Sequence, residues 1–243
     1  MQRQIIIFFF LIVVLFHLTA CSEDADSEDI RTSGIYAGMD VVATADDNVN
    51  IEVFLKVGGS GSNTYLNLTS GDKLTAILND SESLTLTKHE ESDGDIFYVG
   101  SFTSSVAGAE NSVIKILFER SANDVSALDS VVTLPAAPSG LIADKNSFQR
   151  STENLNLSWD TVDSSNDLLL KYEGDCIQNG SVSIVDNGSY TINAGTINDS
   201  NTQNCSVTFS LSRTVDGVLD TDFGEGGYLR AKQTRSIAVV STP

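Results

Sequence analysis

The chain has 243 residues, with 33 Asp and Glu against 14 Lys and Arg, and its formal net charge is −19. Such a charge repels phosphate backbones, and no local cluster of basic residues offsets it, so composition argues against a nucleic-acid partner. Hydrophobic residues make up 41% of the chain, which is enough for a packed core and excludes a wholly disordered protein.

The first twenty residues have the pattern of a secretion signal. Arg3 is followed by an unbroken apolar run from Ile5 to Phe16, which is long enough for a signal-peptide core and too short for a membrane span of ~20 residues. The next segment, Leu18-Thr19-Ala20-Cys21, resembles the lipobox of bacterial lipoproteins. The resemblance implies that residues 1–20 are removed, that the sulfur of Cys21 carries diacylglycerol, and that its new amine is acylated.

The expected location follows from this resemblance. Two or three acyl chains hold a protein on a membrane essentially permanently, so the predicted anchor is lipid. In lipoprotein sorting of Gram-negative bacteria, a residue such as Ser22 after the cysteine implies the outer membrane, given a source of that kind. An ordinary secretory signal, or a short N-terminal anchor in which Cys21 is incidental, is the alternative.

Residues 21–33 are expected to form an acidic, flexible tether. Positions 22–33 hold five acids and one base, and almost no side chain there suits a core. Charged segments of this kind repel themselves and extend. A spacer between membrane and folded part is the preferred interpretation, and a functional acidic segment is the alternative.

From Gly34 onward the apolar residues follow a period of two. Ile51, Val53, Leu55 and Val57 alternate with more polar neighbours, and the same pattern recurs at 84–87 and 114–119. This alternation is typical of strands with one face in a core and the other in water. Turn clusters at 58–63, 70–72, 79–81 and 92–95 separate the runs. We therefore predict about eight short strands in an antiparallel β-sandwich over residues 34–135.

A second β-sandwich is predicted over residues 136–243. Pro135 and Pro138 lie close together, and proline ends a sheet because it lacks a donor for the ladder. The predicted strands that follow are 155–159, 168–172, 182–185, 190–192, 207–211, 228–231 and 237–240.

This second unit resembles fibronectin type III and immunoglobulin domains over roughly 105 residues. The resemblance is carried by Ala137-Pro138-Ser139-Gly140-Leu141, as a proline-bearing first strand, and by Leu155-Asn156-Leu157-Ser158-Trp159, as a second strand that ends in tryptophan. Trp159 shares its parity with Leu155 and Leu157, which predicts a core residue and not a platform for ligands.

The same resemblance implies a disulfide. It places Cys176 at the end of the third strand and Cys205 at the start of the sixth, which are antiparallel neighbours in an immunoglobulin-like sheet. A bridge is then geometrically reasonable, and an oxidising envelope would permit it. Two buried free thiols are the alternative. Neither cysteine has CxxC spacing or a nearby His, so nothing favours redox catalysis.

No catalytic residue is nominated by the sequence. Ser70 with Lys73, and Ser112 with Lys115, match the pattern Ser-x-x-Lys, but that chemistry needs a helix start, and these pairs fall in a turn and a strand. The two histidines are His17, in the segment expected to be removed, and His89, so His-based catalysis is not supported. We predict a protein that is not an enzyme.

Two acidic loops are weak candidates for a structural calcium ion, and no other cofactor is expected. Calcium prefers clustered hard oxygens in sharp turns. The candidate ligands are Glu90, Glu91, Asp93 and Asp95 in one loop and Asp216, Asp220, Asp222 and Glu225 in the other. Neither loop has the residue order of an EF-hand, and hairpin turns rich in Asp and Gly are common, so solvated turns are the preferred interpretation.

The predicted function is therefore a non-catalytic one. We expect a membrane-anchored envelope protein that acts in binding, adhesion or assembly, with a protein or a glycan as its partner. The alternatives are a glycan-directed hydrolase using loop carboxylates and a calcium-dependent binding module. Sugar binding usually uses exposed aromatic faces, and Tyr65, Tyr98, Tyr172 and Tyr228 are expected to be half-buried strand residues instead.

Overall fold

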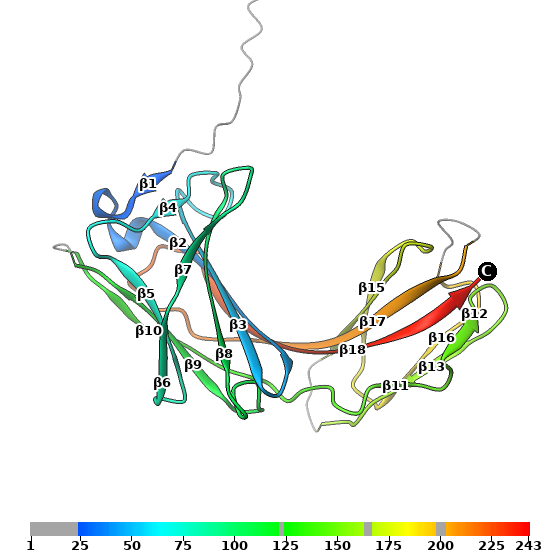
Figure 1. Cartoon of the computed structure of the whole chain (residues 1–243). Helices are drawn as coiled ribbons and strands as arrows, with labels where there is room; N and C mark the ends of the chain where they lie inside the picture. The colour runs from blue at the N-terminus through cyan, green and yellow to red at the C-terminus, as the bar shows by residue number, and fades with distance from the viewer. Residues whose placement is uncertain (1–23, 122–123, 163–166, 198–202) are drawn as a thin grey trace, which may run out of the picture.

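The computed structural model describes residues 24–121, 124–162, 167–197 and 203–243 (Figure 1). The predicted lipid-bearing Cys21 and His17 lie outside these residues. The described helices are two short 3₁₀ turns, η1 (Ser27–Asp29) and η2 (Thr32–Gly34), and none of them could cross a bilayer. The all-β prediction is confirmed.

The strands are short except for four that run for ten residues or more. Up to Thr133 they are β1 (Ala25–Asp26), β2 (Ile35–Ala45), β3 (Asn48–Val57), β4 (Leu66–Asn67), β5 (Lys73–Leu78), β6 (Glu82–Thr85), β7 (Thr87–Glu90), β8 (Ile96–Thr103), β9 (Val113–Glu119) and β10 (Ala127–Thr133). Beyond it they are β11 (Ile142–Ala143), β12 (Ser147–Gln149), β13 (Leu155–Ser158), β14 (Leu168–Glu173), β15 (Gly180–Ile184), β16 (Ser189–Ile192), β17 (Cys205–Asp216) and β18 (Tyr228–Thr242).

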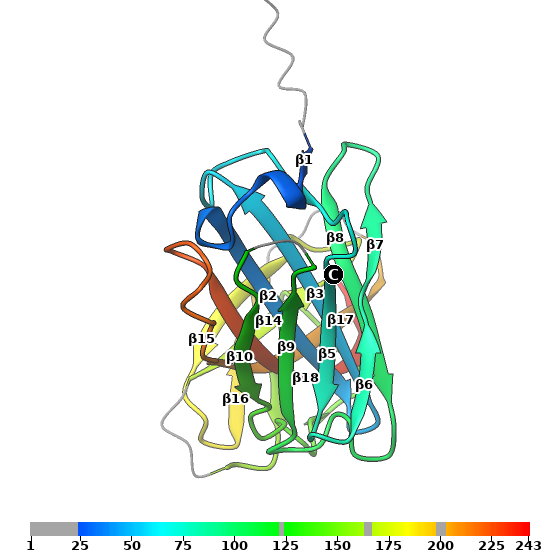
Figure 2. The ribbon, with the colours of Figure 1, turned by 90° about the vertical axis from the view of Figure 1, so that its left-hand side faces the viewer.

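The first sandwich packs two layers around one core. The sheet β10-β9-β5-β6 forms one layer, and β2, β3, β8 and β7 belong to the other (Figure 2). Val49, Ile51, Val53 and Leu55 of β3 are fully buried in this core, whereas the residues between them are not. Period-two alternation therefore predicted this strand and its buried face correctly.

The second sandwich is built in the same way. The sheet β11-β13-β16 faces β15, β14, β17 and β18 across a separate core. Trp159 lies in this core with 6% of its surface exposed, as its parity predicted.

A long hairpin joins the two sandwiches into one sheet. β17 pairs with β18 from Cys205↔Ser241 to Asp216↔Arg230, and the first residues of β18, 228–233, also pair with β2 (Figure 1). Leu229 of β18 lies in the first core and Val239 in the second. Residues 136–243, expected as one unit, thus contribute to both cores.

Three pairings also depart from the purely antiparallel expectation. β18 pairs with β2, β12 with β18, and β1 with β4 in parallel. In the first case the chain crosses from the second sandwich along β17, turns in the loop 217–227, and then enters β18 beside β2. No tight turn connects β2 directly with β18. Parallel neighbours need such crossover connections.

A buried ion pair lies where the linker between β10 and β11, residues 134–141, meets the second sandwich. Arg213 of β17 is 2% exposed, and its guanidinium donates to the Asp186 carboxylate and to the backbone carbonyl of Ala136. Asp186 also accepts a hydrogen bond of 2.8 Å from the indole nitrogen of Trp159. Arg213 therefore ties the linker, β17 and the second core together.

The segment before β2 differs from the expected flexible tether. Ala25 donates from its backbone to the Tyr65 carbonyl at 2.9 Å, and Ser27 and Thr32 are buried at 0% and 1% exposure. The buried Arg120 donates to the carbonyls of Ser27 and Ile30, and its Nε lies 2.9 Å from the Asp72 carboxylate. Residues 25–34 are thus packed on the first sandwich, because their polar backbone groups surround one buried cation.

Candidate functional site

The nine-stranded sheet has one face turned away from both cores. On β2 and β3 this face carries the even-numbered residues, such as Asp40, Val42 and Glu52, because the odd-numbered ones fill the first core. We call it the outer face.

The outer face is hollowed over β2, β3, β7 and β8. The hollow has a volume of about 460 Å³ and is lined by Asp40, Val42, Asn50, Ile51, Glu52, Thr87, Val99, Gly100 and Ser101. Val42 and Val99 supply apolar lining, while the carboxylates, the amide and the hydroxyls supply hydrogen-bonding groups. Asp40 and Glu52 are directly opposite each other in the register of β2 and β3.

Asp40 is held in a network of three side chains. Its Oδ2 accepts a hydrogen bond of 2.7 Å from the Tyr228 hydroxyl, and its Oδ1 lies 3.2 Å from the guanidinium of Arg230. That guanidinium also lies 4.0 Å from the centre of the Tyr228 ring. Burial, and then the neighbouring Asp40 carboxylate, raise the pKa of Tyr228 to about 12. The tyrosine therefore stays a hydrogen-bond donor, and Asp40 is fixed as an acceptor at the edge of the hollow.

An aromatic cluster continues from this network along the outer face. The Phe54 ring centre lies 6.1 Å from those of Tyr36 and Tyr228 and 6.3 Å from that of Phe97. The Phe54 ring lies over Gly38, where an added Cβ would meet it at 2.2 Å, so a larger residue at position 38 would displace the ring. The rings therefore form an aromatic cluster beside the hollow, in which Tyr36 is buried and the other three rings are partly exposed.

Sequence reasoning missed this arrangement. Of its residues only Tyr228 was considered, as a half-buried strand residue. The available signal was the parity of Asp40, Glu52 and Phe54, which places polar and aromatic side chains on the non-core face of strands that were otherwise well predicted. What the sequence lacked was the pairing of β2 with β18, which brings Tyr228 to Asp40.

Tyr98 and Tyr172, also considered as contact residues from the sequence, have structural roles. Tyr98 is 3% exposed, and its hydroxyl donates to the Leu66 carbonyl at 3.0 Å and accepts from the Leu68 amide at 2.8 Å. Burial raises the pKa of Tyr98 to about 12. Tyr172 packs against the second core.

The first acidic loop forms a tight turn after β7. Glu91 and Asp95 close it with a backbone hydrogen bond of 2.9 Å. Glu90 pairs with Lys88 at 3.1 Å, Asp93 is exposed, and Asp95 accepts a hydrogen bond of 2.7 Å from the Tyr65 hydroxyl. The carboxylates of Glu90 and Asp95 therefore bind two different side chains, Lys88 and Tyr65.

The second acidic loop is organised by Asp220. Its carboxylate accepts from the backbone amides of Asp129 at 2.7 Å and Asp222 at 2.9 Å, whereas Asp216, Asp222 and Glu225 are exposed. Across the described ranges, no group of three His, Cys, Asp or Glu side chains is placed to hold a metal ion. Calcium binding at either loop stays a prediction.

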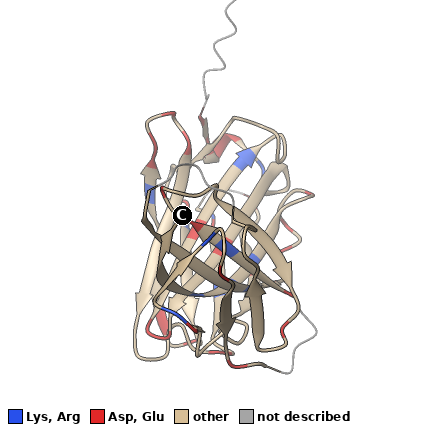
Figure 3. Cartoon of the chain, turned by 90° about the vertical axis from the view of Figure 1, so that its right-hand side faces the viewer, with Lys and Arg blue, Asp and Glu red and all other residues tan. Residues whose placement is uncertain are grey.

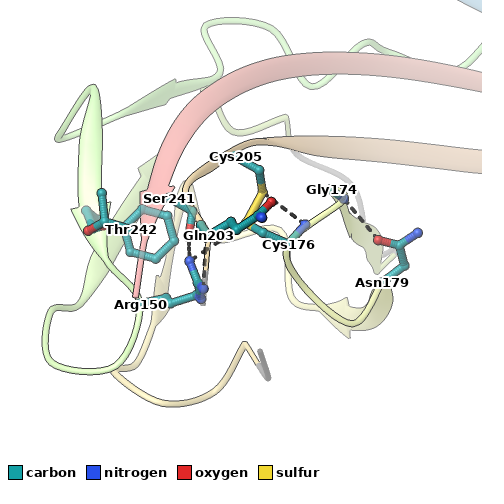
Figure 4. Close-up of a disulfide and its surroundings, with 9 residues drawn as sticks. Arg150, Gly174, Cys176, Asn179, Gln203, Cys205, Ser241 and Thr242 are labelled. Atoms are coloured by element: carbon teal, nitrogen blue, oxygen red, sulfur yellow. Dashed lines mark hydrogen bonds between the residues drawn. A yellow bond between two sulfur atoms is a disulfide. The ribbon is translucent and has the colours of Figure 1, made fainter. Parts of the chain in front are cut away.

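The cysteines at 176 and 205 are joined by a disulfide (Figure 4). Their Cα atoms are 5.6 Å apart, and β14 and β17 are antiparallel neighbours, as the resemblance implied. The buried Arg150 packs beside the bridge, where it donates to the Gln203 carbonyl at 3.2 Å and contacts Ser241. The bridge thus closes the end of the second sandwich.

Removing the bridge should destabilise the protein. Closing a loop over a sequence separation of 29 residues restricts the unfolded chain, so a double Cys176→Ala, Cys205→Ala variant should lose about 3–4 kcal/mol of unfolding free energy. Urea unfolding of the wild type in reducing buffer should reproduce the loss. An unchanged midpoint in both experiments would contradict the prediction.

Within the described part of the chain, the charged side chains are not gathered into one site. Asp and Glu are spread over strands and loops, with fewer Lys and Arg between them (Figure 3). We take the hollow with its aromatic border as the candidate site, because its carboxylate, amide and hydroxyl groups all line one cavity.

No protein-family model matches the chain, and no curated protein matches it. Solved structures similar to it include the chicken CNTN1 FN1–FN3 domains, at 12% identity and a TM-score of 0.30, covering 88% of this chain and 68% of that one. Domains A168–A170 of titin match at 9% identity and a TM-score of 0.24, covering 85% of this chain and 65% of that one. A pullulanase from Anoxybacillus sp. LM18-11 matches at 9% identity and a TM-score of 0.24, covering 72% of this chain and 24% of that one. The fold itself is two β-sandwiches that share one sheet.

Proposed function

We propose that the protein is a non-catalytic binding module of the cell envelope, attached to a membrane through lipid on Cys21. The ligand proposed for it is a saccharide, bound in the hollow between Asp40 and Ser101. The observation that carries the proposal is the convergence of carboxylate, amide and hydroxyl groups on a hollow of about 460 Å³ with apolar lining.

The size and lining of the hollow support a small hydroxylated ligand. Pockets for small ligands usually measure about 300–1,000 Å³ and combine apolar lining with a few polar groups that fix orientation. A sugar ring has hydroxyls around its edge and apolar C–H faces. Asp40 and Glu52 can accept hydrogen bonds from the hydroxyls, and the Asn50 amide can both donate and accept. Val42 and Val99 can contact the C–H groups.

A glycan hydrolase has one observation in its favour, the facing carboxylates of Asp40 and Glu52. Glycoside hydrolysis needs one of two carboxyl groups to be kept protonated as the acid catalyst, usually by apolar surroundings. Asp40 instead lies beside the Arg230 guanidinium, and Glu52 is exposed to water. The arrangement suits binding better than bond cleavage.

Filling the hollow should abolish saccharide binding. We expect Ser101→Phe to weaken binding at least tenfold in titration calorimetry against a panel of bacterial envelope saccharides, because the new ring occupies the hollow. Ser101 is exposed on the outer face, so the melting temperature should hardly change. Mass spectrometry of the bound saccharide should show no cleavage.

Thr208→Phe is the matched control. Thr208 is also an exposed hydroxyl residue on the outer face, but it lies on β17 in the second sandwich, away from the hollow. This variant should bind as the wild type does. Equal binding by Ser101→Phe and the wild type, or no binding by any saccharide of the panel, would overturn the proposed ligand. Cleaved products would favour the hydrolase.

A further inference from the structure

We propose that the anchored protein stands on the bilayer with one end of its first sandwich against the lipid headgroups. This end, the β1 end, consists of β1, the loop 58–64 and the turn 91–95. The inference rests on the lipid anchor proposed above and adds the orientation that the anchor imposes.

The chain between the anchor and the folded part is very short. Ala25 is already fixed, because its backbone amide donates to the Tyr65 carbonyl and β1 pairs with β4. Four residue steps separate Cys21 from Ala25, and a chain covers at most ~3.6 Å per residue, so Ala25 lies within about 14 Å of the lipid-bearing residue. The sequence predicted a tether through residue 33, which would have allowed more than twice that reach.

The β1 end is held together by its own contacts. The loop 58–64 is closed by a backbone hydrogen bond of 3.0 Å between Val57 and Thr64, and the next residue, Tyr65, accepts from Ala25. The Tyr65 hydroxyl donates to Asp95 in the turn 91–95. Because these parts are connected, whatever fixes Ala25 near the membrane brings loop and turn there too.

The chemistry of this end suits the headgroup layer rather than the hydrocarbon interior. The loop 58–64 reads Gly-Gly-Ser-Gly-Ser-Asn-Thr and has neither a charge nor a large apolar side chain. Tyr65, the residue after this loop, is hydrogen-bonded to Asp95, and Glu91 and Asp93 belong to the same turn. The polar loop can lie among hydrated headgroups, while the carboxylates prevent deeper insertion. The turn at 46–47 lies at the other end of β2 and β3 (Figure 1).

Energy transfer to the membrane surface tests this orientation. Full-length lipidated protein with Ser60→Cys or Asp47→Cys would carry a donor dye and sit in phosphatidylcholine vesicles with acceptor on the headgroups. Both positions are exposed, and the length of β3 separates them by roughly 30 Å, so transfer from position 60 should exceed that from position 47 by at least about twofold.

Two controls separate orientation from anchoring. A flexible Gly/Ser insert of about 20 residues after Asp24 should make the two transfer efficiencies converge. A Cys21→Ser protein should fail to float with the vesicles. If the wild type floats but position 60 transfers no more than position 47, the orientation is overturned and the anchor stands. If the wild type does not float, anchor and orientation both fall.

Discussion

An Arg213→Met substitution is expected to lower the free energy of unfolding by about 3–5 kcal/mol. The guanidinium and the carboxylate of Asp186 are exposed by only 2% and 1%. Methionine fills a similar volume but leaves the Asp186 charge buried, with the Trp159 indole as its remaining donor among these groups. It also removes the hydrogen bond to the Ala136 carbonyl. Urea unfolding followed by tryptophan fluorescence would measure the loss, since Trp159 is the only tryptophan.

The exposed pair of Lys115 and Asp80 provides the matched control. Their atoms are 2.6 Å apart, but the side chains are 41% and 72% exposed, so Lys115→Met should cost less than about 1 kcal/mol. The double variant Arg213→Met, Asp186→Leu should recover much of the lost stability, because both charges are then gone. A small effect of Arg213→Met alone would show that the ion pair does not hold the linker.

Sequence patterns predicted most strands because strands depend on local rules. Alternating apolar residues specify a strand and its buried face, as Ile51 and Val53 do in β3. The pairing of Cys176 with Cys205 followed instead from the resemblance to immunoglobulin domains, and the structure contains this bridge.

The joined sheet could not be predicted in the same way. Residues 228–231 and 237–240 were predicted as two strands, yet they belong to the single strand β18. The polar residues at 232–236 do not form a turn; they lie in the part of β18 that passes from the first core to the second. Gln233 is fully buried there, where its amide donates to the Gly108 carbonyl at 2.6 Å. Hydrophobic periodicity cannot distinguish such a gap from the end of a strand.

The candidate site was out of reach for a related reason. The hollow is formed by β2, β3, β7 and β8, whereas β18 lies far from them in the sequence. Only the parallel pairing of β18 with β2 places Tyr228 and Arg230 beside Asp40. Composition likewise described residues 22–33 as a tether because five acids suggest solvation. It could not reveal that Arg120, some ninety residues later, would bind their backbone.

An Arg120→Met substitution should release this N-terminal segment and destabilise the first sandwich by about 3–5 kcal/mol, because the Asp72 carboxylate, at 0% exposure, loses its cationic partner. Hydrogen exchange at the amides of residues 27–34 should rise well before the rest of the sandwich opens. Unchanged protection in this segment would contradict the role given to Arg120.

The same segment should respond to acid. Asp124 accepts from the Thr32 amide at 2.7 Å, and the Thr32 and Val125 amides hold its pKa below the usual value. A lowered pKa means that the carboxylate stabilises docking at neutral pH and that this contribution is lost as the pH falls through the lowered value. Without these contacts β1 is held only by its own short pairing with β4 and Tyr65, so Arg120→Met or acid should favour its release and lengthen the reach from Cys21. In the Arg120→Met protein, energy transfer from positions 60 and 47 should therefore become similar.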